Sequence, residues 1–363
     1  MKSFCVLNSA VTPAVAQNIG SAVAEVLGGK LGVLYCGSEA SCAAAYNIAK
    51  GIKKQGGCAL LASDAFESQT TFACEHYALD GVFFISGEAK CSINVCGTNS
   101  TNLNSTQEDE ISALIAKDKL SGHRGGIYFH TDLNCVYYKH LIETAGCLDG
   151  VAVSVKSENL LIKNQLVRAL LALGGENKGR VTFFISPSGR CLSAVDEYGK
   201  IHSHDELLSV LYSHIILQDK TPVEISFSLS DALDTLAKEK GVEIRRSFAG
   251  GKELFTKDSV FLAVNILSYM SRIGCGLYEL CSALPQTSVS RKTFTSTKDI
   301  MNFADEIDCE ELVTDGKSVF AKVRGSNVLV TPNGTRGRYC LEVQATDSET
   351  AREIALNLTD IYI

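Results

Sequence analysis

Short apolar runs alternate with helical segments along the first part of this chain. The runs Leu31–Cys36, Cys58–Ser63 and Gly81–Ser86 are separated by Ser41–Gln55 and Ser68–Tyr77, in which apolar residues follow helical spacing. Apolar runs of this length, bounded by glycine and turn residues, are typical of strands buried on both faces. Because strands that alternate with helices pair in parallel as βαβ units, the pattern predicts an α/β fold with mainly parallel sheets.

The helix limits follow from capping residues. The first helix is predicted to begin after Thr12, with Pro13 at its first position, and to end before the Gly28-Gly29 pair. A later helix is predicted at Gln107–Lys117, with Thr106 as its N-cap.

The alternation restarts twice and then changes character. The restarted strands are predicted at Gly150–Val155, Val181–Ile185 and Val223–Phe227. The last segment instead places a helix at Asp299–Ile307 before three closely spaced strands and a closing helix. Those elements are predicted at Val319–Val323, Asn327–Val330, Tyr339–Ala345 and Ser348–Tyr362. Strands separated only by tight turns pair antiparallel, so we expect a small C-terminal α+β module.

Length and composition limit the class of protein. The chain has 363 residues, 45% of them hydrophobic and 21% charged, which is ordinary for a globular protein of two to four domains. The net charge of −7 and the lack of a basic stripe argue against nucleic-acid binding. No apolar run of about 18 residues is present, so no membrane span is expected. The opening segment is too short in apolar residues for a signal peptide, and we expect a cytoplasmic protein.

The chain contains fourteen cysteines, which raises the question of a metal or disulfide framework. No two of them form a C-x-x-C pair, and most, such as Cys36 and Cys74, stand among apolar residues. We therefore expect reduced cysteines that pack as small hydrophobic side chains. The segment H-S-H-D-E at His202–Glu206 resembles a metal cluster, but a helix start with Ser203 or Asp205 as the N-cap also accounts for it.

A glycine-containing turn near the C-terminus is the main candidate for anion binding. The segment V-L-V-T-P-N-G-T-R-G-R-Y-C spans Val328–Cys340. Asn333 and Gly334 tolerate left-handed backbone, and successive N–H groups of such a turn can form an anion-binding nest beside Arg336 and Arg338. The alternative is a plain tight turn between two strands.

Several segments, in the same order, resemble one enzyme family. They are Leu79–Ser86 (L-D-G-V-F-F-I-S), Cys191–Gly199 (C-L-S-A-V-D-E-Y-G), Val328–Thr335 and the tail E-V-Q-A-T-D-S-E-T-A-R-E-I-A. Together they resemble the α-D-phosphohexomutases, a group that includes phosphoglucomutase, phosphomannomutase and phosphoglucosamine mutase. The resemblance implies three α/β domains and a C-terminal α+β phosphate-loop domain. Their predicted limits are 1–120, 121–218 (shortened), 219–297 (without the family's sugar-reading loop) and 298–363.

The serine motif of that family is altered here. Active members carry T-A-S-H-N-P, and the serine transfers a phosphoryl group to the sugar. This chain reads I-S-G-E-A-K at Ile85–Lys90, with no Ser-His pair and a shorter loop. Ser86 is the nearest hydroxyl and is taken as the remnant of the catalytic position. A plain strand-end serine is the alternative, because a nucleophile needs its partners as well as its hydroxyl.

The metal motif of the family is altered more strongly. Family members bind Mg²⁺ through the three aspartates of D-G-D-G-D-R, which match Ile185, Pro187 and Gly189 here. None of these side chains can replace a carboxylate ligand. We therefore predict no metal or other cofactor. Arg190 alone matches the motif, and the resemblance implies that it lines the cleft.

The phosphate loop of the family, R-P-S-G-T-E-P, is partly kept. Asn333, Gly334 and Thr335 match its backbone shape, while Thr331 replaces its first arginine. Arg336 and Arg338 could supply positive charge from new positions. These five residues from Asn333 to Arg338, without Gly337, are the predicted phosphate-binding set.

These departures suggest a phosphohexomutase-fold protein without mutase catalysis. It would bind a phosphosugar or phosphate, or regulate or partner an active mutase or another protein, with no nucleic acid and no membrane among its partners. The alternative is a divergent sugar-phosphate mutase that interconverts hexose 1-phosphate and 6-phosphate with a rearranged site. Phosphoryl transfer depends on positioned charge, so loss of metal and nucleophile together favours the first hypothesis.

Overall fold

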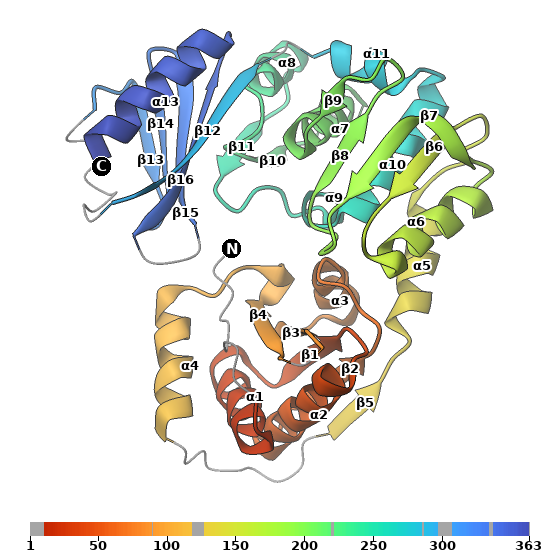
Figure 1. The fold of residues 1–363 in the computed structure, drawn as a ribbon, viewed down its shortest axis with the longest axis vertical. Coiled ribbons are helices and arrows are strands. Elements are labelled where there is room, and N and C mark those ends of the chain that lie inside the picture. The colour runs from red at the N-terminus through yellow and green to blue at the C-terminus, as the bar shows by residue number, and fades with distance from the viewer. Residues whose placement is uncertain are drawn as a thin grey trace. The chain divides into compact units, whose positions relative to one another are not determined.

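The computed structural model describes residues 11–88, 90–117, 127–218, 221–284, 287–296, 307–333 and 337–362. The chain forms two compact units. We call them the N-terminal unit, Ser3–Ile201 with Glu253–Gly274, and the C-terminal unit, His202–Lys252 with Cys275–Ile363. Figure 1 shows their helices and strands. In the described part of the chain, no helix is both long and apolar enough to cross a membrane.

The N-terminal unit contains the predicted parallel sheet. Its five strands have the order β4-β3-β1-β2-β5 (Figure 1). They are β1 (Lys30–Tyr35), β2 (Cys58–Ala62), β3 (Gly81–Ser86), β4 (Ser92–Gly97) and β5 (Ile127–His130). β1 pairs in parallel with β2 and β3, β2 pairs in parallel with β5, and β4 runs antiparallel at the edge. The βαβ prediction is confirmed, and β5 is an additional strand.

The helices of this sheet are α1 (Pro13–Leu27), α2 (Glu39–Lys54), α3 (Gln69–Tyr77) and α4 (Ser105–Lys117), with a 3₁₀ turn, η1, at Thr98–Ser100. Thr12 caps α1 as predicted. α4 instead begins with a capping box, because Asn104 Oδ1 accepts from Gln107 N–H and Gln107 Oε1 accepts from Asn104 N–H. The Thr106 cap was therefore wrong. α1 and α2 approach closely at Gly51, where a Cβ would overlap the carbonyl oxygen of Gln17.

A second sheet has the order β6-β7-β8-β9. The strands are β6 (Ala152–Lys156), β7 (Glu176–Ile185), β8 (Leu192–Val195) and β9 (Ile201–His202). β6 and β7 pair in parallel, and β7 and β8 pair antiparallel. The helices α5 (Leu133–Thr144), α6 (Leu160–Ala172), α9 (Leu254–Lys257) and α10 (Ser259–Ile273) also belong to the N-terminal unit.

The C-terminal unit begins with a small parallel pair and ends in an antiparallel sheet. Its first elements are α7 (His204–Gln218), β10 (Val223–Ser226), α8 (Ala232–Lys240), β11 (Ile244–Ser247) and α11 (Leu277–Ser282). The antiparallel sheet has the order β12-β16-β15-β14-β13. Its strands, in that order, are Ser288–Thr295, Arg338–Ala345, Ser326–Pro332, Val319–Val323 and Glu311–Thr314.

The last helix, α13 (Ser348–Tyr362), packs its buried residues against this sheet (Figure 1). The predicted C-terminal α+β module is thus present, and the α/β fold class is confirmed. Most of the helix predicted at Asp299–Ile307 lies outside the described residues. The limits of four domains stay a prediction.

Candidate functional site

Ser86 is the last residue of β3 in the N-terminal unit. It pairs with Ser92 of β4 and is half-buried. β3 and β4 pair antiparallel, and directly after β3 Gly87 has φ +108°, where a Cβ would overlap the Lys90 carbonyl oxygen. Ser38 Oγ donates to Gly87 O at 2.6 Å, so Gly87 is tied to the start of α2. Ser86 therefore stands at the end of a strand that turns back at once.

Cys36 lies beside Gly87 at the end of β1. Its thiol is 3.5 Å from Ser41 Oγ and 3.9 Å from Gly87 O. Burial raises the pKa of the Cys36 thiol, but its hydrogen bonds with Ser41 and Ser38 outweigh burial, so the pKa lies below its ordinary value. The side chain is exposed, which makes the prediction of a small packed hydrophobe wrong for Cys36. The signal in the sequence is its place at a strand end directly before Gly37-Ser38, the cap of the next helix.

The segment 185–190 leads from β7 toward β8, and its backbone accepts hydrogen bonds from residues at the starts of α3 and α10. Ser68 N–H donates to Ser188 O at 3.0 Å, and Ser259 N–H donates to Gly189 O at 2.8 Å. Within the loop, Gly189 N–H donates to Ser186 O at 2.9 Å. The backbone oxygens of this loop are thus used by the first residues around α3 and α10. Ile185 itself is buried in the core.

Arg190 turns its guanidinium inward from that loop. Nη2 donates to Thr70 Oγ1 at 2.8 Å and to Glu67 O at 3.4 Å, and Nη1 donates to Lys257 O at 3.3 Å. Nε lies 3.8 Å from the Glu67 carboxylate. The side chain is only 12% exposed. Arg190 therefore joins the loop to α3 and α9 within the N-terminal unit.

The predicted phosphate-binding set lies at the β15–β16 hairpin of the C-terminal unit. Asn333 N–H donates to Arg338 O at 2.8 Å, which closes the hairpin, and both side chains are exposed. Gly334, Thr335 and Arg336 lie outside the described residues. The hairpin itself agrees with the predicted turn between two strands.

Comparison with known proteins supports one family. No protein-family model matches this chain. Over 209 residues it is 26% identical to phosphoglucosamine mutase of Corynebacterium diphtheriae, a match that covers 47% of this chain and 44% of that protein. The chain thus matches less than half the length of this curated relative.

Solved structures match almost the whole chain. A phosphoglucomutase/phosphomannomutase family protein from Burkholderia thailandensis superposes with a TM-score of 0.77 at 14% identity, over 98% of this chain and 94% of the other. The chain has the α-D-phosphohexomutase fold. The phosphoglucomutase parafusin from Paramecium matches with a TM-score of 0.65 at 10% identity, over 96% and 91% of the two chains. The resemblance seen in the sequence is therefore confirmed at the level of fold.

The segment 185–190, which the sequence resemblance alone matches to the phosphohexomutase metal loop, lacks the carboxylate ligands that Mg²⁺ usually takes. Mg²⁺ requires several oxygen ligands, usually including carboxylates, in octahedral geometry. The only side-chain oxygens of the segment 185–190 are the hydroxyls of Ser186 and Ser188, which lie 3.2 Å from each other. The Glu67 carboxylate lies 3.8 Å from Arg190 Nε and is paired with that guanidinium. In the described ranges, no three His, Cys, Asp or Glu side chains are grouped closely enough to hold a metal ion.

The segment His202–Glu206 is a helix start, in agreement with the capping interpretation. Ser203 N–H donates to Glu206 Oε2 at 2.6 Å, and Glu206 N–H donates to Ser203 Oγ at 3.3 Å. This reciprocal pair is a capping box at the beginning of α7. Burial lowers the pKa of His204 to about 4, which favours a neutral imidazole.

Proposed function

We propose that this chain is a phosphohexomutase-fold protein that lacks mutase catalysis and binds a phosphosugar or inorganic phosphate. The observation that carries the proposal is the inward engagement of Arg190. This arginine and the backbone of residues 186–190 are held by Glu67, Thr70 and the start of α10. The loop that should present metal ligands in an active mutase is used here to join elements of the fold.

Phosphoryl transfer needs a nucleophile and a neutralising charge that are both in place. Ser86 is a half-buried strand-end residue, and Gly87 after it is tied down through its carbonyl oxygen. Without a fitting Mg²⁺ site, charge on the transferred phosphoryl group would be poorly neutralised. These features support binding without turnover.

Ligand binding is assigned to the β15–β16 hairpin. Arg338 is exposed there, beside the exposed Asn333. The sequence adds Gly334, Thr335 and Arg336, whose residue types suit an anion nest with a second guanidinium. A protein partner, such as an active mutase, would be a further route to a regulatory role.

A divergent sugar-phosphate mutase is the second candidate. The favouring observation is the likeness of nearly the whole chain to a phosphoglucomutase/phosphomannomutase family protein, with a TM-score of 0.77. In that case Ser86 would have to carry a phosphoryl group during the reaction.

Two measurements on the full chain separate the candidates. Calorimetric titration with glucose 1-phosphate, glucosamine 6-phosphate and inorganic phosphate, each with and without Mg²⁺, tests binding. Intact-mass spectrometry after incubation with a hexose 1,6-bisphosphate tests phosphorylation of the peptide that contains Ser86. We expect Mg²⁺-independent binding and no added phosphoryl group. A phosphorylated Ser86 together with mutase turnover would overturn the proposal in favour of the enzyme.

A matched pair of variants locates the phosphate site. Arg338→Ala should weaken phosphosugar binding at least severalfold, because it removes a cation that can form a charge-assisted hydrogen bond. Arg324→Ala is the control, since Arg324 is 70% exposed in the same unit and pairs with Glu353 instead. Equal affinity in both variants would place the phosphate site elsewhere.

A further inference from the structure

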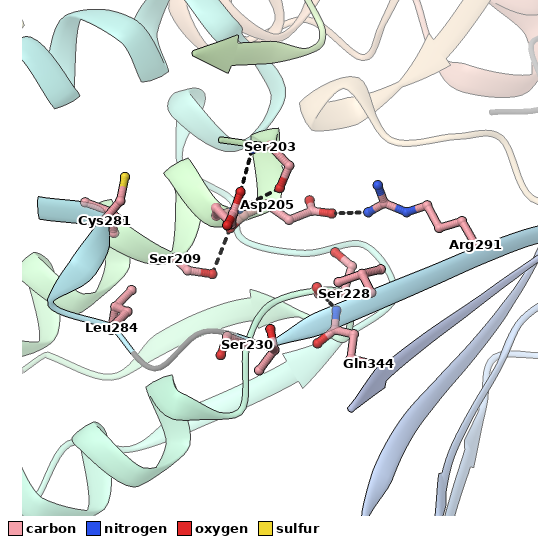
Figure 2. Close-up of a pocket in the computed structure, with 13 residues that line it drawn as sticks. Ser203, Asp205, Ser209, Ser228, Ser230, Cys281, Leu284, Arg291 and Gln344 are labelled. Carbon is pink, nitrogen blue, oxygen red and sulfur yellow. Dashed lines mark hydrogen bonds and ion pairs between the residues drawn. The ribbon is translucent and has the colours of Figure 1, made fainter. Parts of the chain in front are cut away.

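The C-terminal unit contains a pocket with a volume of about 250 Å³, distinct from the β15–β16 hairpin. Its walls come from the start of α7, the β10–α8 connection, the residues Cys281, Leu284 and Thr287, and the strands β12 and β16. Figure 2 shows Cys281 and Leu284 on one side of this space and Arg291 and Gln344 on the other. The volume lies just below the range of drug-sized ligand sites, so it suits a molecule the size of one monosaccharide.

Gln344 carries the strongest indication of a ligand. Its side chain lines the pocket, and the residue is only 7% exposed. Nε2 donates to Ser228 O and to Glu342 Oε1, the latter at 3.0 Å. Because rotating the amide would place Oε1 against these two acceptors, its orientation is fixed. Oε1 then has no hydrogen-bond partner in the described part of the chain.

A buried amide oxygen without a partner costs free energy, since the lost hydrogen bond to water is not replaced. Several such atoms occur among the described residues, and Gln344 Oε1 is the one that belongs to a residue lining this pocket. The alternation of side chains along β16 explains why the Gln344 amide is buried. Leu341 and Val343 of β16 face the core under α13, and the alternate residues Glu342 and Gln344 face the other way. That second face would be solvent-exposed in a plain two-layer module, but here it forms the wall of the pocket. The unpaired acceptor calls for an O–H or N–H donor.

The remaining lining suits a polyol. Hydroxyls surround the pocket, from Ser203, Ser209, Ser228, Ser230 and Thr287. Ser230 Oγ accepts from Ala232 N–H at 3.2 Å, which uses a lone pair and not its hydrogen. Apolar surface from Val210, Leu284 and Val289 can contact the C–H groups of a sugar ring.

The charges around the pocket oppose an anionic ligand. Asp205 and Glu206 line it, and Arg291 is the one cation among its lining residues, all of which are described. Arg291 is already engaged, with Nη2 2.7 Å from Asp205 and Nε 2.7 Å from Glu342. The acidic side chains thus outnumber the guanidinium. A phosphate or carboxylate would be repelled, whereas a hydroxyl or a protonated amine would not.

We propose that this pocket binds a monosaccharide-sized polyol without a phosphate group, and that an amine on the ligand strengthens binding. A hydroxyl or amine of the ligand donates to Gln344 Oε1. This site is independent of the phosphosugar binding proposed above, because it uses other residues and selects against phosphate.

Calorimetric or saturation-transfer NMR titrations with glucosamine, glucose and their 6-phosphates test the proposal on the full chain. We expect glucosamine to bind more tightly than glucose, and both unphosphorylated sugars to depend on the pocket. Val289→Trp should weaken their binding at least tenfold, because Val289 is 46% exposed at the pocket and an indole there would fill it. Leu312→Trp is the matched control, since Leu312 is 39% exposed on β13 and lies outside the pocket lining.

Gln344→Met tests the hydrogen bond itself. This substitution keeps the volume and removes the acceptor, together with the Nε2 donors to Ser228 O and Glu342 Oε1, so we expect glucosamine binding to weaken about tenfold. Arg338→Ala should leave glucosamine binding unchanged, which keeps this test separate from that of the phosphate site. The proposal is overturned if neither unphosphorylated sugar binds, if the 6-phosphates bind more tightly in a manner sensitive to Val289→Trp, or if Val289→Trp and Leu312→Trp behave alike.

Discussion

Arg190 and Arg291, one in each unit, both pair with acidic or oxygen acceptors, but they differ in exposure and in the space beside them. Arg190 in the N-terminal unit is 12% exposed, and it donates to side chains and backbone oxygens of α3 and α9. Arg291 in the C-terminal unit is 50% exposed and bridges two carboxylates at the edge of a pocket. The first guanidinium is enclosed by the fold, whereas the second leaves open space beside it.

The difference shows how polar residues can be retained without a catalytic role. Around Arg190, backbone oxygens of the 185–190 loop accept hydrogen bonds from Ser68 and Ser259, so the loop serves packing. Around Arg291, the nearby Gln344 Oε1 has no partner in the described part of the chain. Arg190 Nε also has no hydrogen-bond partner in the described residues and lies 3.8 Å from the Glu67 carboxylate, whereas the unpartnered Gln344 Oε1 belongs to a residue that lines a pocket. An unpartnered polar atom therefore points to a ligand only where open space adjoins it.

The largest effect that this comparison predicts is on stability. Arg190→Met should lower the free energy of unfolding by about 3 kcal/mol, because it leaves the partly buried Glu67 carboxylate and the oxygens Thr70 Oγ1, Glu67 O and Lys257 O without their donor. The chain has no tryptophan, so urea unfolding followed by far-UV circular dichroism is the suitable measurement. Arg190→Lys serves as the conservative control, and its free energy of unfolding should fall by less than that of Arg190→Met. A stability within about 0.5 kcal/mol of wild type would mean that Arg190 is not structural.

The second prediction concerns the pH dependence of stability. Asp258, fully buried at the start of α10, accepts from Tyr137 Oη and from Val260 N–H, both at 2.9 Å. Burial raises its pKa from 3.8 to about 6. A folded-state pKa above the unfolded value gives a contribution to stability that is present below about pH 4 and is lost as pH rises through about 6. Wild type should therefore lose stability between about pH 4 and pH 6, and Asp258→Asn should not show that loss.

The test is to measure urea unfolding midpoints of wild type and Asp258→Asn at several pH values between about 4 and 7.5. Wild type should lose stability relative to the variant as the pH rises. Asp205 in the other unit, with a pKa raised to about 6 by burial and by Glu342, contributes in the same direction, and Asp205→Asn isolates it. His204, with its pKa lowered to about 4, acts in the opposite direction. The prediction is thus the difference between wild type and variant, and parallel curves would contradict it.

The sequence predicted the fold well where the signal was local. Apolar runs located β1, β2 and β3, and Thr12-Pro13 located the start of α1. It missed β5, β12 and β13, since β5 and β13 have only four residues each and β12 reads S-V-S-R-K-T-F-T, with buried Phe294 as its main apolar signal. Short or polar strands are defined by their partners, which a local pattern does not contain.

The sites were predicted less well for the same reason. The loss of carboxylates from the 185–190 segment could be read directly from the sequence. The inward turn of Arg190 could not, because its partners Glu67 and Thr70 lie about 120 positions earlier in the chain. Likewise, L-E-V-Q-A predicts an outward polar face on β16, yet Glu342 and Gln344 are 8% and 7% exposed. Only the elements opposite that face reveal the pocket.

The third prediction asks whether the N-terminal unit keeps any reactive group. Cys36 should react with iodoacetamide near neutral pH severalfold faster than exposed Cys135 or Cys147, because its thiol pKa is lowered. Ser41→Ala should slow it by removing the hydrogen bond that has the largest lowering effect. Peptide mass spectrometry after timed alkylation measures both. Equal rates at the three cysteines would indicate that this edge of the sheet is chemically ordinary.

The smallest effect is expected for the other arginine. Arg291→Met should lower the free energy of unfolding by about 1 kcal/mol or less, because the guanidinium is half-exposed and the buried Glu342 carboxylate keeps a hydrogen bond from Gln344 Nε2. Its main consequence should be electrostatic. Without the guanidinium, Asp205 and Glu342 repel each other, so the Asp205 pKa should rise further, which NMR titration of the carboxyl carbon can follow. If Arg291→Met were as destabilising as Arg190→Met, both arginines would be structural, and the contrast between a closed loop and an open pocket would fail.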